Sequence, residues 1–306
     1  MIDEKEKKNS SFNVRKFFFP FSPIKSFRSI RLLMLLAILI ALRLVFGVLT
    51  IRVAPFALSI SIAWLPLMVI GWYFGPVIGL VIGMLTDTIS FLMAGGGIWF
   101  WMYAIQEPIV GLISGLVGGW CRFRQLNINK KFTLDIVIDQ ILVIGFAVLS
   151  YVILIVWLDP SKHFQGHEEE FKQFYSIYKW VAIAGISFLI VVFEALMILT
   201  MTKKIGNKDH HTMINFVYTS SLVIVTMFLF SIALGPITAV EYVRFISGVT
   251  PEAFLKYGSI FYLVPRVAVE GIKVPLESLA LFGVVSLFDS QVENVVNRIN
   301  NSWVIY

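Results

Sequence analysis

The chain has 306 residues, of which 58% are hydrophobic and only 14% are charged, and its mean hydropathy is +0.83. This composition excludes an ordinary soluble domain and predicts an all-α, multi-pass membrane protein. The net charge of +6 does not indicate a nucleic-acid partner, because the basic residues cluster in particular loops and are better explained as topology signals. The single cysteine, Cys121, excludes a disulfide framework and a thiolate metal site.

Residues 1–29 are basic and precede the first apolar run. We expect them to lie along the cytoplasmic membrane surface, with a disordered tail as the alternative. The apolar run is too long for a signal-peptide core, so we expect it to be retained. Because a helical span needs about 20 apolar residues, the sequence predicts eight spans. Their approximate limits are 30–50, 62–74, 76–94, 98–120, 133–158, 179–202, 212–236 and 260–288.

The distribution of Lys and Arg between the loops predicts how the spans are oriented. With a cytoplasmic N-terminus, the inside segments carry sixteen basic residues and the outside segments carry six. Because cytoplasmic loops are enriched in Lys and Arg, we expect a protein of the cell membrane with both termini in the cytoplasm.

Glycines recur at four-residue spacing around the second, third and fourth predicted spans. Small residues at this spacing let helix backbones approach closely within a lipid bilayer. We expect the glycines to pack these spans together and assign them no chemistry. They are Gly71, Gly75, Gly79, Gly83, Gly111, Gly115 and Gly119.

The last predicted span carries four ionisable side chains on one face, at Arg266, Glu270, Lys273 and Glu277. Each charge at membrane depth costs at least ~2.5 kcal/mol. The stripe must therefore face the protein interior, a partner charge or a polar ligand.

Pro265 is well suited to be the first residue of this last helix, which would put Arg266 at a helix N-terminus. The free N–H groups there, together with the guanidinium, predict an outward-facing anion site that suits a carboxylate. The alternative is that Arg266 with Glu270, and Lys273 with Glu277, are internal ion pairs that only neutralise each other.

Three glycines at 95–97 precede a segment of four aromatic rings in five positions, among them Trp99, Trp101 and Tyr103. Such a hinged segment can close over a planar ligand, although aromatic residues are also typical of the membrane interface. Arg52, in the loop after the first span, is expected on the same outer side.

Several chemistries are missing from the sequence. It contains no G-x-x-x-x-G-K-[ST] loop, no H-E-x-x-H motif and no nucleophile–base pair at membrane depth. We therefore expect no bound ATP, no metal, no cofactor and no enzymatic activity. Other polar residues at membrane depth are Arg43, Asp87, Gln106, Glu107, Asp135, Asp139 and Glu194. Of these, Arg43 is expected to face the interior.

Residues 37–120 resemble the membrane-embedded S components of energy-coupling factor (ECF) vitamin transporters. The shared motifs are Ala37-x-x-x-Ala41, Leu65-Pro66, Phe74-Gly75-Pro76, Gly79-x-x-x-Gly83-x-x-x-Asp87 and the stretch from Pro108 to Gly119. Near the C-terminus, Pro265-Arg266, Lys273 and Pro275 are similar to the final helix of the folate-type branch.

The resemblance implies a subunit that captures a vitamin outside the cell, folate or a related carboxylate-bearing vitamin, and passes it to a T component driven by two ATPase subunits. It also implies that Ala37 and Ala41 dock against the T component. The binding site would lie under the loops at 51–61, 94–103 and 237–264.

Two departures from the family are expected. S components usually have six spans, so the surplus pair lies within 133–202, and folate-type proteins carry an arginine where this chain has Leu58, Ser59 and Ile60. The predicted organisation is a basic segment (1–29), helices one to four (30–121), an inserted helical pair (122–211), the C-terminal S-component-like helices (212–290) and a cytoplasmic tail (291–306).

The interpretation that we test below assigns Arg266 and Lys273 to the anion and Glu270 to positioning Lys273. Trp99, Trp101 and Tyr103 would stack on the ring of the vitamin, with Arg52 nearby. One rival is a proton-coupled secondary transporter of a small organic anion that uses the carboxylates of Asp135, Asp139, Glu194 and Glu270. The other is a non-transporting membrane scaffold.

Overall fold

The structure is a computed structural model of the whole chain. It describes residues 17–18, 20, 30–49, 51–54, 58–60, 62–93, 98–126, 132–152, 180–181, 183–188, 190–192, 194–195, 197–199, 210–250, 252, 255 and 260–301. Most of the predicted N-terminal segment, the 95–97 hinge and the end of the C-terminal tail lie outside the described residues.

The described part of the chain is built mainly from helices. They are α3 (Ile30–Val48), α4 (Trp64–Phe74), α5 (Pro76–Met93), α6 (Trp101–Ala104), α7 (Gln106–Leu126), α8 (Phe132–Val152), α10 (His210–Met227), the π-helix η4 (Phe228–Ala233), α11 (Gly235–Ser247) and α13 (Ile260–Asn301). Every described residue between 180 and 199 is also helical, and we call these residues the 180–199 segment.

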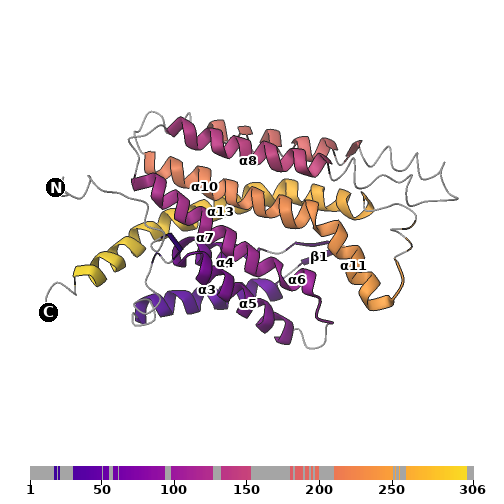
Figure 1. Cartoon of the computed structure of the whole chain (residues 1–306), viewed down its shortest axis with the longest axis horizontal. Coiled ribbons are helices and arrows are strands. Elements are labelled where there is room, and N and C mark those ends of the chain that lie inside the picture. Colours follow the sequence, from indigo (N-terminus) through magenta and orange to yellow (C-terminus); the bar gives the residue numbers. More distant parts are fainter. Residues whose placement is uncertain are drawn as a thin grey trace.

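The long helices run along the long axis of the molecule (Figure 1). In this view α8 forms one side of the bundle, α10 and α13 lie in the middle, and α3 and α5 form the other side. At one end, which we call the hairpin end, lie the strands described below, α6 and the projecting α11. At the other end, the C-terminal part of α13 extends beyond the bundle.

The helices agree in part with the eight predicted spans. Three described regions are long and apolar enough to cross a membrane: Pro76–Met93, Trp101–Gln125 and Thr212–Ala233. Shorter apolar helices occupy Leu32–Val48, Trp64–Phe74, Ile136–Gly145 and Ile183–Leu199. A helical, multi-pass membrane protein is therefore supported, while the number of eight crossings stays a prediction.

The all-α fold class is supported by the described residues, which contain one short β-hairpin besides the helices. Strands β1 (Ile51–Ala54) and β2 (Leu58–Ile60) pair in antiparallel fashion after α3, with Ile51 opposite Ile60. Ile51 and Val53 alternate with other residues along β1, and β-branched side chains at that spacing suit a strand. This hairpin, part of the predicted outer loop 51–61, packs against α13 through β2.

Helix α11 occupies residues 237–247 of the predicted outer connection 237–264. The helix has Pro236 in its first turn and ends at Gly248, which has a left-handed φ of 68° and donates its N–H to the Arg244 carbonyl. Proline at the start and glycine just after the end are common helix boundary signals. A window tuned to 20 apolar residues does not detect a 13-residue helix.

The last helix begins at residue 260, the predicted limit of the last span, and not at Pro265, which the anion-site prediction took as its first residue. α13 starts at Ile260, so Pro265 is inside the helix and Arg266 is not at its N-terminus. The added turn buries Tyr262 and Leu263, which are 3% and 1% exposed. The anion-binding argument from the helix dipole therefore does not apply to Arg266, because that effect is confined to the first turn.

The predicted close packing of the glycine-containing helices is confirmed. A Cβ on Gly79 of α5 would overlap the backbone of Gly111 of α7, and a Cβ on Gly111 would overlap Gly79. A Cβ on Gly71 of α4 would also overlap the backbone of Gly111. Helices α4, α5 and α7 therefore form one tightly packed unit, as small residues allow in a bilayer.

Candidate functional site

The charged stripe of α13 lies inside the bundle rather than towards lipid. Lys273 Nζ is 3.9 Å from Glu270 Oε1 and 3.7 Å from Glu277 Oε1. The two glutamates are 5% and 3% exposed, and the Lys273 side chain is 13% exposed. The predicted pairing of Lys273 with Glu277 is therefore present, and Lys273 is shared with Glu270.

Two neighbouring helices cover the Lys273 ammonium. It lies 5.8 Å from the centre of the Trp64 ring on α4 and 3.7 Å from the sulfur of Met227 on α10. A cation over an indole face is attracted by the ring quadrupole. Trp64 in turn packs edge-on against Phe230 of η4, with ring centres 5.6 Å apart. Lys273 is thus enclosed by an aromatic ring and a polarisable sulfur.

Arg266 lies about two turns nearer the hairpin end. Its guanidinium interacts with the Tyr103 hydroxyl of α6. It also packs on Gly235 of α11, where an added Cβ would stand 2.5 Å from Arg266 Nη1. Among the described residues, no carboxylate lies within the 4.0 Å ion-pair distance of Arg266. The predicted Arg266–Glu270 contact is therefore at most a longer-range attraction.

Three polar atoms of this stripe are buried without a hydrogen-bond partner: Arg266 Nε, Glu270 Oε2 and Glu277 Oε1. Buried polar atoms are nearly always hydrogen-bonded, so three such atoms on one helix face need an explanation. The stripe contains two cations and two acids, and its formal charge is balanced. It can offer one strong donor and two strong acceptors to a guest molecule.

An aromatic cluster joins α6 to α11 at the hairpin end. Phe100, which is 7% exposed, lies with its ring centre 5.9 Å from Tyr103, 5.6 Å from Tyr242 and 5.4 Å from Phe245. The rings of Tyr103 and Tyr242 are 5.3 Å apart in an edge-on arrangement. Tyr103 therefore links this cluster to Arg266.

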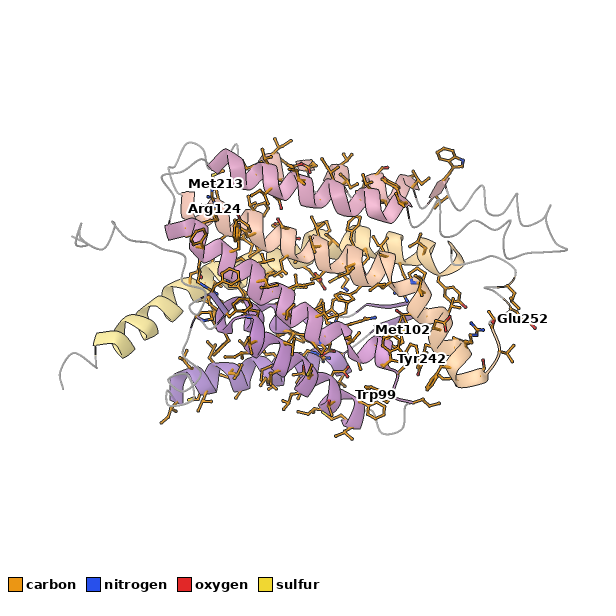
Figure 2. All side chains as sticks on the ribbon, viewed as in Figure 1. Trp99, Met102, Arg124, Met213, Tyr242 and Glu252 are labelled. Atoms are coloured by element: carbon orange, nitrogen blue, oxygen red, sulfur yellow. The ribbon has the colours of Figure 1, made fainter. Side chains whose placement is uncertain are left out.

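The other two predicted stacking residues lie differently. Trp99 and Trp101 are 53% and 59% exposed, and Figure 2 shows Trp99 at the edge of the bundle. Of the three rings predicted to meet a ligand, Tyr103 is the one beside the charged stripe. Arg52 is on β1 opposite Ser59, in the hairpin that packs against α13. Contact of Arg52, Trp99 or Trp101 with a ligand stays a prediction.

Sequence reasoning did not identify Trp64, Met227, Gly235 and Tyr242 as neighbours of the stripe. Trp64 opens the short second span, and an aromatic residue at a span end is ordinary in a membrane protein. Met227 and Gly235 flank the π-helix, whose departure from α-helical geometry leaves no clear signal in the sequence. Of these four residues, only Tyr242 lies on an amphipathic helix, α11, whose periodic pattern of apolar residues can be detected in the sequence.

The comparisons with known proteins agree with this architecture. The family model for the S component of the ECF-type riboflavin transporter matches residues 27–172, which include α3 to α8. A protein of Mycoplasma pneumoniae described as "Uncharacterized protein MG313 homolog" is 33% identical over 288 residues, which is 93% of this chain and 99% of that protein. "Uncharacterized protein MG313" of Mycoplasma genitalium is 30% identical over 291 residues, with the same coverage. No solved structure matches significantly.

A helical membrane protein that matches this model is a transporter subunit and not an enzyme. Residues 27–172, a little under half of the chain, match the S-component family of ECF transporters. The chain also shares nearly its full length with the two mycoplasma proteins. The matched model is of the riboflavin type, so the comparisons do not support the folate-type branch.

Proposed function

We propose that this chain is the substrate-binding subunit of an ECF importer for a flavin-like vitamin, with ATP hydrolysed by partner subunits. The observation that carries the proposal is the buried stripe of α13, in which Arg266 Nε and Glu270 Oε2 have no hydrogen-bond partner and Glu277 Oε1 has only its 3.7 Å ion-pair contact with Lys273 Nζ. The riboflavin-type family match supports the choice of ligand.

The charge balance of the stripe favours a neutral ligand over folate. Glu270 and Glu277 offset Arg266 and Lys273, which leaves no excess positive charge for the two carboxylates of folate. A flavin ring is planar and neutral, and its edge carries one N–H donor between two carbonyl acceptors. Arg266 Nε would donate to a carbonyl, one glutamate oxygen would accept from the ring N–H, and the other would accept from a hydroxyl of the ribityl chain. A ring that satisfied these atoms would remove the cost of leaving them buried and unpaired.

The direct test is riboflavin binding to the purified protein, measured by the quenching of flavin fluorescence. Replacing Arg266 by Gln removes a charged hydrogen bond worth about 1.5–3 kcal/mol, which weakens binding by about 10- to 100-fold. Gly235→Ala should also weaken binding, because its Cβ displaces the guanidinium by steric overlap. Both variants should keep the bundle folded.

The matched control is Arg244→Gln on α11, where the arginine side chain is 60% exposed and paired at 3.6 Å with Glu241. This change should leave flavin affinity unaltered. The flavin proposal fails if Arg266→Gln binds riboflavin as tightly as the unmodified chain. It also fails if folate binds and riboflavin does not.

We further propose that the hairpin end faces outward, that both termini are cytoplasmic, and that α3 docks against a T component. Ala37 and Ala41 are exposed on α3, on the side away from its buried residues Leu36, Leu39 and Arg43. Two small exposed residues one turn apart leave a shallow surface on which another helix can approach closely.

Copurification tests this assembly. A tagged chain should bring down a T component and two ATPase subunits, and Ala37→Trp should reduce their recovery at least tenfold by filling the shallow surface of α3. The control is Val81→Trp, at a residue of α5 that is 53% exposed. Equal recovery with both tryptophan variants would contradict docking through Ala37. Riboflavin uptake into liposomes by this chain alone would contradict the need for partners.

A further inference from the structure

Two acidic side chains with buried carboxyl oxygens lie in α8 and in the 180–199 segment, away from the charged stripe of α13. Asp139 of α8 is 2% exposed, and both of its carboxyl oxygens are buried without a hydrogen-bond partner. Glu194 of the 180–199 segment acts on it electrostatically. Glu194 Oε2 accepts a 2.8 Å hydrogen bond from Gln140 Nε2, whereas Glu194 Oε1 is buried and unpartnered. Three buried carboxyl oxygens therefore have no hydrogen-bond donor from the protein.

The described helices around these acids carry no basic side chain that could neutralise them. The sequences of α8, residues 180–199, α10 and η4 contain no lysine or arginine. The helices packed against α8 among the described residues include α10 and η4. Other titratable side chains on these elements are Asp135, Tyr151, His210, His211 and Tyr218. Of the titratable groups, Glu194 is the one that acts electrostatically on Asp139.

The position of Asp139 on its helix shows that its burial is built into the packing. It is four residues before Val143 and eight before Ala147, which are 1% and 4% exposed and belong to the hydrophobic core. Residues at this spacing share one helix face. Asp139 is therefore on the face of α8 that is turned towards the core, where water does not compensate an ionised carboxylate.

Two ionised carboxylates cannot persist there without a positive charge, since burying even one isolated charge is very costly. Carboxylate oxygens are hard ligands that suit small, hard cations. We propose that Asp139 and Glu194 together bind one monovalent cation, either a proton or Na⁺. The Gln140 amide stabilises the negative charge that remains on Glu194. The cation couples α8 to the 180–199 segment, independently of any vitamin at the α13 stripe.

The test is thermal unfolding of the purified full chain at constant ionic strength. If the cation is Na⁺, replacing choline by Na⁺ at pH 8 should raise Tm by at least about 3 °C. If it is a proton, Tm in choline should rise by a similar amount as pH falls from 9 to 6. The sign follows because the folded chain then holds a proton that the unfolded chain releases at high pH.

Asp139→Asn keeps the shape of the side chain and removes its charge. It should therefore abolish the dependence of Tm on Na⁺ or on pH, and it should raise Tm in choline at pH 9. Glu194→Gln should have the same effects on Tm, and it replaces Asp139→Asn in the test if that variant folds poorly. Glu241→Gln, at an exposed acid of α11, should keep the dependence of the unmodified chain. The proposal is overturned if the unmodified chain responds to neither Na⁺ nor pH. It is also overturned if both neutral variants respond as the unmodified chain does. Riboflavin affinity does not enter this readout, so the two proposals fail separately.

Discussion

Replacing Gly111 by valine is expected to prevent α5 and α7 from packing and to leave little folded protein. The backbones of Gly111 and Gly79 are in direct contact, and a Cβ on either one would overlap the other helix. Overpacking costs about 1–3 kcal/mol where side chains can adjust, and more where they cannot. Here the obstacle is backbone, so we expect a loss above ~3 kcal/mol, measured as a lowered Tm and as aggregation in size-exclusion chromatography.

Gly145→Val provides the matched control. Gly145 is also within an apolar helix, α8, but an added Cβ there would meet no heavy atom within 4 Å. Both variants replace glycine by the same β-branched residue, so the intrinsic helix preference changes equally. If Gly111→Val and Gly145→Val melted within about 2 °C of each other, close packing at Gly111 would not be what holds α5 to α7.

Much of the helical layout followed from composition and spacing. The predicted break between the spans 62–74 and 76–94 is present, because Gly75 adopts a positive φ of 94° and Pro76 starts α5. The glycine spacing also predicted the closest helix contacts. These features depend on residues near one another in sequence, where period and steric restriction act directly.

What could not be predicted depends on contacts between distant segments. The helical period placed the four charges of α13 on one face, but it could not show that Trp64 and Met227 would cover Lys273. It also could not show that Arg266 would meet Tyr103 instead of an acid. Such neighbours are selected by tertiary packing of side chains 30 or more positions apart, for which local periodicity carries no information.

The pairing of Arg43 with Glu107 is another contact that could not be predicted from the sequence. Both were predicted at membrane depth, but 64 residues separate them. Arg43 Nε donates to Glu107 Oε2 at 2.9 Å, and Nη2 bonds the other oxygen, which makes a two-point contact between α3 and α7. The Thr86 hydroxyl of α5 donates to Glu107 Oε2 at 3.1 Å. Three helices are therefore joined by one buried polar cluster.

Breaking this pair is expected to destabilise the chain strongly. Arg43→Met leaves Glu107 buried without its counter-ion, and removal of one partner of a buried pair costs about 3–5 kcal/mol. Glu107→Leu should cost less, because Asp87 also attracts Arg43 and stays in place. We would measure both effects as the free energy of unfolding in detergent micelles.

The double variant Arg43→Met with Glu107→Leu decides what the pair contributes. If the cost of each single change comes from the charge left unpaired, the double variant should regain most of the lost stability, because no charge of the pair remains buried. A double variant as unstable as the sum of the single ones would contradict this account. It would mean instead that the geometry of the two-point contact, and not the neutralisation of charge, fixes α3 against α7. The exposed Ala37 and Ala41 surface would then depend on that contact for its position, and loss of partner copurification should accompany the loss of stability.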